Sequence, residues 1–157
     1  MKMRRATLAV IVKNGQVLLG YKKKEEIGTG TWNGPGGKIE DGETSIECVI
    51  RETEDELGIR LIDPTLTAVI YFYAGGECMF EAGVYRATEF EGEPTETDVM
   101  IPKWFPKDNL PLNKMLESDH KWFQKAVQGE KFGARVYYKE IAKEFDRIEF
   151  FDFPESV

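Results

Sequence analysis

Apolar residues near the start of the chain fall into two runs of strand length. The segment ATLAVIVKNGQVLLGYK, residues 6–22, places valine, leucine and isoleucine on both sides of Asn14 and Gly15. Asn-Gly favours the left-handed backbone of a two-residue hairpin turn, and β-branched residues favour strands. The pattern therefore predicts an antiparallel hairpin at the beginning of the chain.

The spacing of the apolar residues becomes helical at residues 44–58. Thr44 followed by Glu47 forms a capping box, which predicts the start of a helix. Gly58 occupies a position at which helices commonly end in a left-handed residue. Between these ends, the apolar residues recur every three or four positions and predict one face that packs on a core. That face is made by Ile46, Val49, Ile50, Thr53 and Leu57.

The rest of the chain predicts further strands and one more helix. Strands are expected at residues 67–73, 79–87, 100–106, 135–141 and 147–153. Residues 118–129 predict a helix that Ser118 caps and Gly129 ends. Residues 28–37 and 89–98 are rich in glycine, proline and polar residues, so we expect loops there. Strands around one helix, with a second helix late, predict an α/β sandwich with a mixed sheet, as a single domain over residues 1–157.

The last turns of the first helix carry an acidic cluster. Glu52, Asp55 and Glu56 stand at i, i+3 and i+4, so like charges share one helix face. They also lie at the negative end of the helix dipole, where basic residues would be stabilising. A divalent cation would remove both penalties, and hard carboxylate oxygens suit Mg²⁺ or Mn²⁺ better than zinc. The alternative is a solvated acidic face, which is the usual fate of a charge run.

Residues 37–59, GKIEDGETSIECVIRETEDELGI, resemble the Nudix box, G-x(5)-E-x(7)-R-E-U-x-E-E-x-G-U with U apolar. The match comprises Gly37, Glu43, Arg51, Glu52, Glu56, Gly58 and Ile59. Asp55 stands where a glutamate is expected, and Thr53 where an apolar residue is expected. The segments LLGYKK, GTGTWNGPGGKIEDGET, ETDVMIPKWF, SDHKWF and EKFGARVYY extend the resemblance over most of the chain. They are similar to the MutT-like 8-oxo-dGTP diphosphatases of animal type. The resemblance implies a Nudix-type α/β/α sandwich.

The resemblance also implies roles for the residues of the box. Metal ligands would be Glu52, Asp55 and Glu56, with the carbonyl oxygen of Gly36 or Gly37. Arg51 would hold a neighbouring carboxylate, either Glu56 or Glu43, although an ordinary surface ion pair explains this arginine almost as well. Animal-type members use a further acid at the position of Val99. Either Glu96 or Asp98 replaces it as the base or an extra metal ligand, or both are solvated loop acids.

Asn33 and Asp119 are the residues that we expect to contact a purine base. A carboxamide can donate and accept hydrogen bonds, and Asp119 would require a raised pKa or a donor on the base in an apolar pocket. Two departures from the family concern selectivity: Leu116 replaces a stacking tryptophan, and Ser118 replaces one of two aspartates. Other expected substrate contacts are Thr7, Lys22, Gly36, Gly37, Lys38, Phe72 and Trp122, with Ile27 and Phe80 as further candidate walls.

Composition fits an enzyme domain that acts on a small substrate. The chain has 157 residues, 41% hydrophobic and 31% charged, which is typical of one globular domain. A net charge of -7 argues against a nucleic-acid surface. The same negative charge would repel a triphosphate, so positive charge at the site would come from metals and from Lys22, Lys23, Lys24 and Lys38. Two cysteines, Cys48 and Cys78, predict a reduced, cytoplasmic setting. No segment is long enough to span a membrane, and we expect a monomer.

These observations predict a magnesium-dependent hydrolase. The expected reaction converts oxidised purine nucleoside triphosphates into the monophosphate and pyrophosphate, and so cleans the nucleotide pool. The same site would also suit ordinary nucleoside triphosphates or another nucleoside diphosphate derivative. A third interpretation is a nucleotide-binding or metal-binding protein without activity, which the three retained acids of the helix disfavour.

Overall fold

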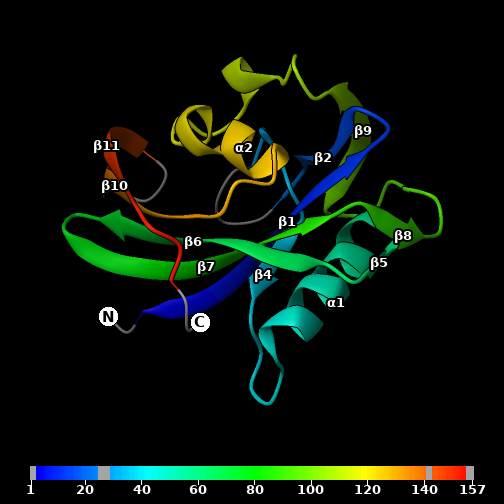
Figure 1. Ribbon diagram of the computed structural model, residues 1–157, viewed down its shortest axis with the longest axis horizontal. Helices are drawn as coiled ribbons and strands as arrows, with labels where there is room; N and C mark the ends of the chain where they lie inside the picture. Colours follow the sequence, from blue (N-terminus) through cyan, green and yellow to red (C-terminus); the bar gives the residue numbers. More distant parts are fainter. Residues whose placement is uncertain (1–2, 25–28, 141–142, 155–157) are drawn as a thin grey trace.

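A mixed β-sheet with a helix on each face forms the centre of the computed structural model, which describes residues 3–24, 29–140 and 143–154 (Figure 1). Its strands are β1 (Arg4–Lys13), β2 (Gln16–Lys22), β3 (Trp32–Asn33), β4 (Gly36–Lys38), β6 (Thr65–Ala74), β7 (Glu77–Ala87), β9 (Met100–Pro106), β10 (Phe132–Glu140) and β11 (Lys143–Phe151). The helices are α1 (Ser45–Leu57) and α2 (Asp119–Val127), with a 3₁₀ turn η1 (Leu112–Lys114). β5 (Arg60–Ile62) and β8 (Glu89–Glu91) form a separate antiparallel pair. No helix in these described ranges is long and apolar enough to cross a membrane.

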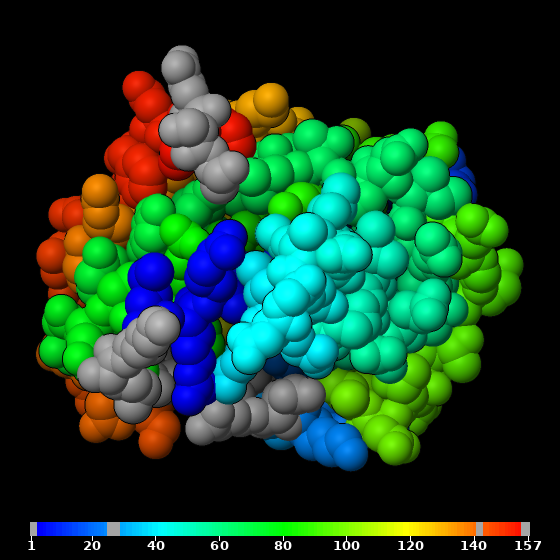
Figure 2. Space-filling view, turned by 90° about the horizontal axis from the view of Figure 1, so that it is seen from below, coloured from blue at the N-terminus to red at the C-terminus, as the bar shows by residue number. Residues whose placement is uncertain are grey.

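The order of strands in the sheet is β11-β10-β6-β7-β1-β2-β3, with β4 paired to β1 and β9 to β2. The pairs β1–β7 and β6–β10 are parallel and the others antiparallel, which confirms a mixed sheet. β1 changes partner along one edge: Thr7 pairs with Gly37 of β4, whereas Ile11 pairs with Leu18 of β2. Figure 2 shows the segment from β4 into α1, in cyan, beside the start of β1, in blue. This change of partner places β4 in the sheet beside β1 and in contact with α1.

The three local signals found in the sequence are present. Asn14 and Gly15 have φ of 53° and 75°, as the predicted hairpin turn requires. Thr44 and Glu47 form both hydrogen bonds of the capping box. Gly58 ends α1 in the left-handed region, with φ of 74°, and its N–H donates to the carbonyl of Glu54.

Four expectations were wrong in part. Residues 28–37 are not only loop, because β3 pairs with the end of β2 and β4 pairs with β1. Likewise β8, within residues 89–98, pairs with β5. Such pairings are tertiary contacts, which local propensity does not record. Ile46 lies at the first turn of α1 and is 41% exposed instead of packing on the core. The fourth concerns Ser118, which does not cap α2 through its side chain.

Each helix covers its own hydrophobic core. On one face of the sheet, Trp122, Phe123 and Ala126 of α2 pack on residues that include Val10 and Ile70. On the other face, Val49 and Leu57 of α1 pack on residues that include Ala9, Ile11 and Leu18. Alternate residues of β1 thus serve opposite cores, as expected for a strand covered on both sides. The two helices are thus fixed on opposite faces of β1.

Candidate active site

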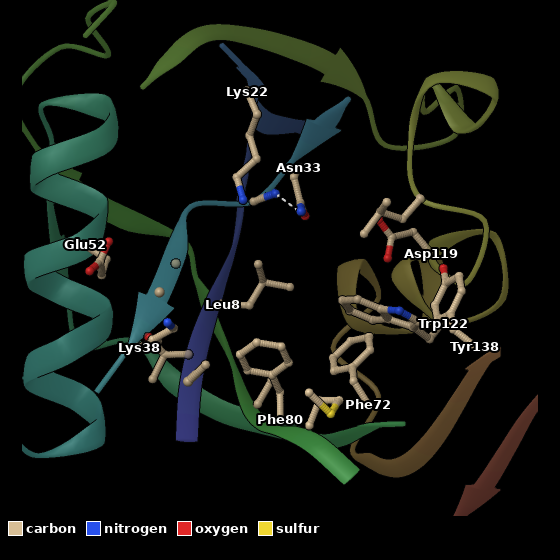
Figure 3. Close-up of a pocket in the computed structure, with 18 of the residues that line it drawn as sticks. Leu8, Lys22, Asn33, Lys38, Glu52, Phe72, Phe80, Asp119, Trp122 and Tyr138 are labelled. Atoms are coloured by element: carbon tan, nitrogen blue, oxygen red, sulfur yellow. Dashed lines mark hydrogen bonds between the residues drawn. The ribbon is translucent and has the colours of Figure 1, made fainter. Parts of the chain in front are cut away.

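A cavity of about 580 Å³ lies between the β4–α1 segment and the start of α2 (Figure 3). Glu52 and Lys38 lie at one end, and Asp119, Trp122 and Tyr138 lie at the other. Between them, the wall is apolar and includes Leu8, Phe72 and Phe80. An elongated molecule with a charged end and a flat end would match this distribution of groups.

The acidic end depends on the close approach of β4 to α1. Glu56 is 3% exposed, and its Oε1 accepts a hydrogen bond of 2.8 Å from the Gly36 N–H. A Cβ on Gly37 would lie 2.6 Å from Cδ of Glu52, and a Cβ on Gly36 would lie 2.0 Å from the carbonyl oxygen of Thr7. A side chain at Gly36 would collide with the backbone of β1, so glycine is required there, whereas a side chain at Gly37 would displace the Glu52 carboxylate.

The register of β4 decides which of its carbonyl groups face α1. The two flanking hydrogen bonds run from Ala9 N–H to Pro35 O and from Ile39 N–H to Arg5 O. Hydrogen-bonded pairs alternate with non-bonded pairs along an antiparallel ladder, so the peptide groups of Gly37 face β1 and those of Gly36 face α1. The hydrogen bond from Gly36 to Glu56 agrees with this orientation. Of the two candidate carbonyl ligands, that of Gly36 is thus the one not paired with β1, whereas that of Gly37 faces β1 and also accepts a weak contact of 3.6 Å from Cys48 Sγ.

Arg51 joins the loop before α1 to the acidic face. Its Nε and Nη2 donate to the carboxylate of Glu43 at 2.6 and 3.0 Å, and its Nη1 donates to Glu52 Oε1 at 2.8 Å. The Arg51 guanidinium and the Glu40 N–H lower the pKa of Glu43 to about 2. Of the two expected partners, the structure therefore places Glu43, and not Glu56, beside Arg51. Planar two-bond contact orients both groups, unlike a loose surface pair.

Asp55 lies on the solvent side of the acidic face, and its side chain is 66% exposed. In the described part of the chain, no three Asp, Glu, His or Cys side chains are gathered closely enough to hold a metal ion by themselves. The two acids that approach β4 are Glu56, which accepts from the Gly36 N–H, and Glu52, which lies against Gly37. These are hard oxygen donors, and they fit Mg²⁺ or Mn²⁺, which commonly use few protein ligands together with water and phosphate oxygens.

Asn33 presents a hydrogen-bond donor to the other part of the cavity. Its Oδ1 accepts from the Gly34 N–H at 2.9 Å, which fixes the carboxamide against its own loop (Figure 3). The Nδ2 group is then the part of this side chain that can be offered to a ligand. The sequence left open whether Asn33 donates or accepts, and the loop contact favours donation.

Asp119 is 3% exposed at the first turn of α2, and burial raises the pKa of its carboxyl to about 7. We expected such a rise if Asp119 lies in an apolar pocket. Within the described residues, Asp119 Oδ2 and Trp122 Nε1 are buried and make no hydrogen bond of good geometry, although the Trp122 side chain lies close enough to lower the pKa of Asp119 somewhat against the effect of burial. Buried polar atoms rarely remain unpaired, so these two indicate a ligand with polar edges. The sequence predicts Trp122 as a substrate contact through its ring, but its spacing cannot reveal the state of its N–H.

The structure brings most of the other expected substrate contacts to the cavity. The lining includes Thr7, Lys22, Gly36, Gly37, Lys38, Phe72, Phe80 and Leu116. Thr7 Oγ1 lies 3.2 Å from Cys48 Sγ, which ties β1 to α1 beneath β4. Sequence reasoning missed Tyr138, because nothing in a strand pattern separates a cavity tyrosine from a core tyrosine. Ser118 is buried beside the lining and contacts Tyr138. Ile27 lies outside the described residues.

The loop acids Glu96 and Asp98 lie away from the cavity lining. Glu96 is 57% exposed and forms an ion pair of 2.9 Å with Lys23. Asp98 is also exposed. The loop is held instead by Thr97, whose Oγ1 donates to the carbonyl of Glu56 at 2.8 Å. A role for either acid as the general base stays a prediction. Glu96 would have to break its ion pair with Lys23 to take that role.

Residues 2–126 match the NUDIX domain model. The chain belongs to the Nudix family. It is 39% identical over 127 residues to the oxidized purine nucleoside triphosphate hydrolase of Danio rerio, and 34% identical over the same length to that of Mus musculus. Each match covers 80% of this chain and 81% of the relative. A crystal structure of a MutT protein from Bacillus halodurans superposes with a TM-score of 0.80 at 27% identity, covering 94% of this chain and 97% of that one. The Nudix α/β/α sandwich is thereby confirmed.

The two departures from the Nudix box have different consequences in this Nudix domain. Thr53 is fully buried, and its hydroxyl donates to the carbonyl of Val49 at 2.7 Å, so its polar atom is satisfied within the helix. Asp55 is shorter than the glutamate of the box and points to solvent, 3.7 Å from Arg51. The first departure therefore leaves no buried polar atom unpaired, and the second places its acid on the solvent side of the helix.

Replacing Arg51 with lysine in this Nudix domain should lower kcat/KM by about tenfold, because lysine cannot make the two-bond contact with Glu43 while also reaching Glu52.

The low pKa of Glu43 means that its contact with Arg51 stabilises the fold above pH about 4.5 and is lost as the pH falls toward 2. The variant should consequently melt at a lower temperature at pH 7 but not near pH 2. Thermal unfolding at both pH values tests this, with the exposed Arg60→Lys as control. Equal melting temperatures at pH 7 would contradict it.

Proposed function

We propose that this Nudix domain hydrolyses oxidised purine nucleoside triphosphates, such as 8-oxo-dGTP, to the monophosphate and pyrophosphate with Mg²⁺ or Mn²⁺. The observation that carries the proposal is the pair of buried polar atoms without partners, Asp119 Oδ2 and Trp122 Nε1, at the cavity end opposite Glu52. The base of a bound nucleotide would supply hydrogen-bond partners for these two atoms, while the phosphates of the same nucleotide reach the acidic end. The two vertebrate relatives, which carry the name oxidized purine nucleoside triphosphate hydrolase, support the same substrate class.

Base recognition follows from the groups at the far end. Oxidation at C8 of a purine creates a new N–H donor at N7 and a new carbonyl acceptor, so the oxidised base presents donors and acceptors on neighbouring edges. Asn33 and Trp122 can donate to it, while Asp119, with its pKa of about 7, can accept when ionised or donate when protonated. The apolar wall of Leu8, Phe72 and Phe80 excludes water from these contacts and strengthens them.

At the acidic end, the chain holds and orients the reacting groups. Glu52, Glu56 and the carbonyl of Gly36 would hold the divalent cation. Such a cation neutralises phosphate charge and lowers the pKa of a bound water. Lys22 and Lys38 line the cavity and attract the polyphosphate. Arg51 fixes the orientation of Glu52.

Hydrolysis requires that a water oxygen bond to phosphorus while the bond from phosphorus to the leaving oxygen breaks. The proton released by the water goes to a carboxylate within reach. Of the two inner acids, Glu52 lines the cavity whereas Glu56 lies behind it, so Glu52 is the better placed acceptor. Glu43 contributes through Arg51 and does not contact substrate.

A second candidate function keeps the site and changes the substrate to ordinary nucleoside triphosphates or another nucleoside diphosphate derivative. The observation that favours it is the cavity wall at Leu116, which offers a branched aliphatic side chain in place of a flat ring. Ser118, moreover, brings no second carboxylate to the base. Both differences reduce the contacts available to discriminate an oxidised base.

We expect the protein to act as a cytoplasmic monomer and a single domain over residues 1–157. The last strands support one domain, because β10 pairs with β6 within the central sheet. Free nucleotides, and not nucleic acid, are the expected partners, since the net charge is -7.

A product assay tests the proposal. The protein is incubated with MgCl₂ or MnCl₂ and separately with 8-oxo-dGTP, 2-oxo-dATP, dGTP, CTP and ADP-ribose. Release of monophosphate and pyrophosphate with a higher kcat/KM for the oxidised purines is the expected result. Higher kcat/KM for dGTP, CTP or ADP-ribose would favour the second candidate. Nucleotide binding without turnover under either metal would leave a binding protein.

A further inference from the structure

A closed pair of hydrogen bonds connects the start of α2 to strand β10. Tyr138 Oη donates to Ser118 Oγ at 2.9 Å, and the Ser118 N–H donates to Tyr138 Oη at 3.1 Å. Ser118 is fully buried and Tyr138 is 7% exposed, so water does not compete for these bonds. Burial raises the pKa of Tyr138, which keeps its hydroxyl neutral at physiological pH. The pair is therefore an intact neutral contact between helix and sheet.

The Ser118 side chain does not cap α2, and the N–H groups of Asp119, His120 and Lys121 donate instead to the carbonyls of Leu116, Glu117 and Ser118. Ser118 has helical dihedral angles, φ of -62° and ψ of -28°, and its side chain makes no capping hydrogen bond. A serine at this position would ordinarily accept from a free N–H of the first turn. Here its hydroxyl is used by β10 instead. The Ser118 N–H and hydroxyl thus tie the turn that begins α2 to strand β10.

Asp119 is the next residue along the chain and the first of α2. Its carboxyl lies in the cavity, and Tyr138 lines the same end (Figure 3). The position of Asp119 relative to Asn33 is set by how α2 is docked on the sheet. A shift of the first turn by a fraction of an ångström would alter any hydrogen bond that Asp119 makes with a base, since such bonds weaken steeply with distance and angle.

We propose that Ser118 and Tyr138 are positioning residues for base recognition, which hold the Asp119 carboxyl at the place where it meets the base. The inference rests on the proposed function, because it assigns the far end of the cavity to a purine. The alternative is that both side chains only stabilise the packing of α2 on the sheet. Tyr138 also packs edge-on against Phe145, with ring centroids 5.5 Å apart, and this packing does not require the hydroxyl.

Tyr138→Phe removes the hydroxyl and keeps the ring packing. For 8-oxo-dGTP, we expect KM to rise about tenfold with kcat within about twofold, since a displaced Asp119 carboxyl would lose about one buried hydrogen bond to the base. Tyr137→Phe is the matched control. It lies next along β10, and its hydroxyl bonds instead to the exposed carboxylate of Glu149 at 3.0 Å, so both constants should stay at wild-type values.

Ser118→Ala and the double variant Ser118→Ala/Tyr138→Phe extend the test. If the two residues act as a pair, the double variant should raise KM about as much as either single variant, and not by the product of the two. A lower melting temperature with unchanged KM would overturn the inference, because it would show a purely structural role. A fall in kcat at constant KM would also overturn it.

Metal-free binding of the monophosphate 8-oxo-dGMP, measured by calorimetry, separates this inference from the proposed function. Weaker binding by Tyr138→Phe, with the Tyr137→Phe control unchanged, is expected. Equal binding by wild type and Tyr138→Phe would overturn the positioning role while the proposed function stands. If the wild type neither binds 8-oxo-dGMP nor hydrolyses 8-oxo-dGTP, the proposed function and the inference both fall.

Discussion

Glu56→Gln should reduce kcat/KM by at least about a hundredfold and leave the fold unchanged, a loss typical of removing one charged group from a catalytic centre. Glu56 is 3% exposed, and its carboxylate meets the N–H of Gly36. Glutamine has nearly the same shape, and its Oε1 can still accept that hydrogen bond. The substitution thus removes one negative charge from the set of oxygens at β4 and little else.

The measurement is steady-state hydrolysis of the best substrate at saturating Mg²⁺, beside thermal unfolding with and without Mn²⁺. The wild type should be stabilised by Mn²⁺, and Glu56→Gln should lose most of that stabilisation. Glu54→Gln is the matched control, because Glu54 lies on the exposed side of the same helix. Undiminished turnover by Glu56→Gln would exclude the assignment of the cation site.

Asp119→Asn should make the protein more stable than the wild type above pH 7. Burial raises the pKa of Asp119 from 3.8 to about 7, so between these values the folded state holds a proton that the unfolded state has lost. The free energy of unfolding therefore falls as the pH rises through this range and levels off above pH 7. The full effect amounts to up to about 4 kcal/mol at 1.36 kcal/mol per pKa unit. Asparagine is neutral at every pH and avoids this loss.

Denaturant unfolding at pH 5 and pH 8.5 checks this expectation. The difference in stability between the variant and the wild type should grow at the higher pH, whereas Asp108→Asn, an exposed loop substitution, should show no such trend. The dependence of KM for 8-oxo-dGTP on pH near 7 should also disappear in Asp119→Asn. If the difference in unfolding free energy between variant and wild type is the same at both pH values, Asp119 is not buried as a protonated acid.

The sequence predicted one end of the candidate site well and the other end poorly. The acidic end came from spacing in one continuous segment, because Glu43, Arg51, Glu52 and Glu56 are brought together by a single helix and the loop before it. The base end depends on β3, α2 and β10, which are far apart along the chain. For that end, the sequence offered only a resemblance at Asn33 and Asp119, and it did not reveal the unpaired N–H of Trp122 or the contact of Tyr138 with Ser118.

The sequence alone determined the features that rest on local chemistry. Asn14 and Gly15 set the hairpin turn, Thr44 and Glu47 start α1, Gly58 ends it, and the helical period fixes which acids share a face. Only the tertiary structure decided that residues 36–38 form a strand, that Asp55 faces solvent while Glu56 is buried, and that Ser118 bonds to β10 instead of capping α2. The reason is physical: turns and caps are satisfied by neighbours in sequence, whereas strand pairing, burial and the choice of a hydrogen-bond partner depend on groups that only folding brings near.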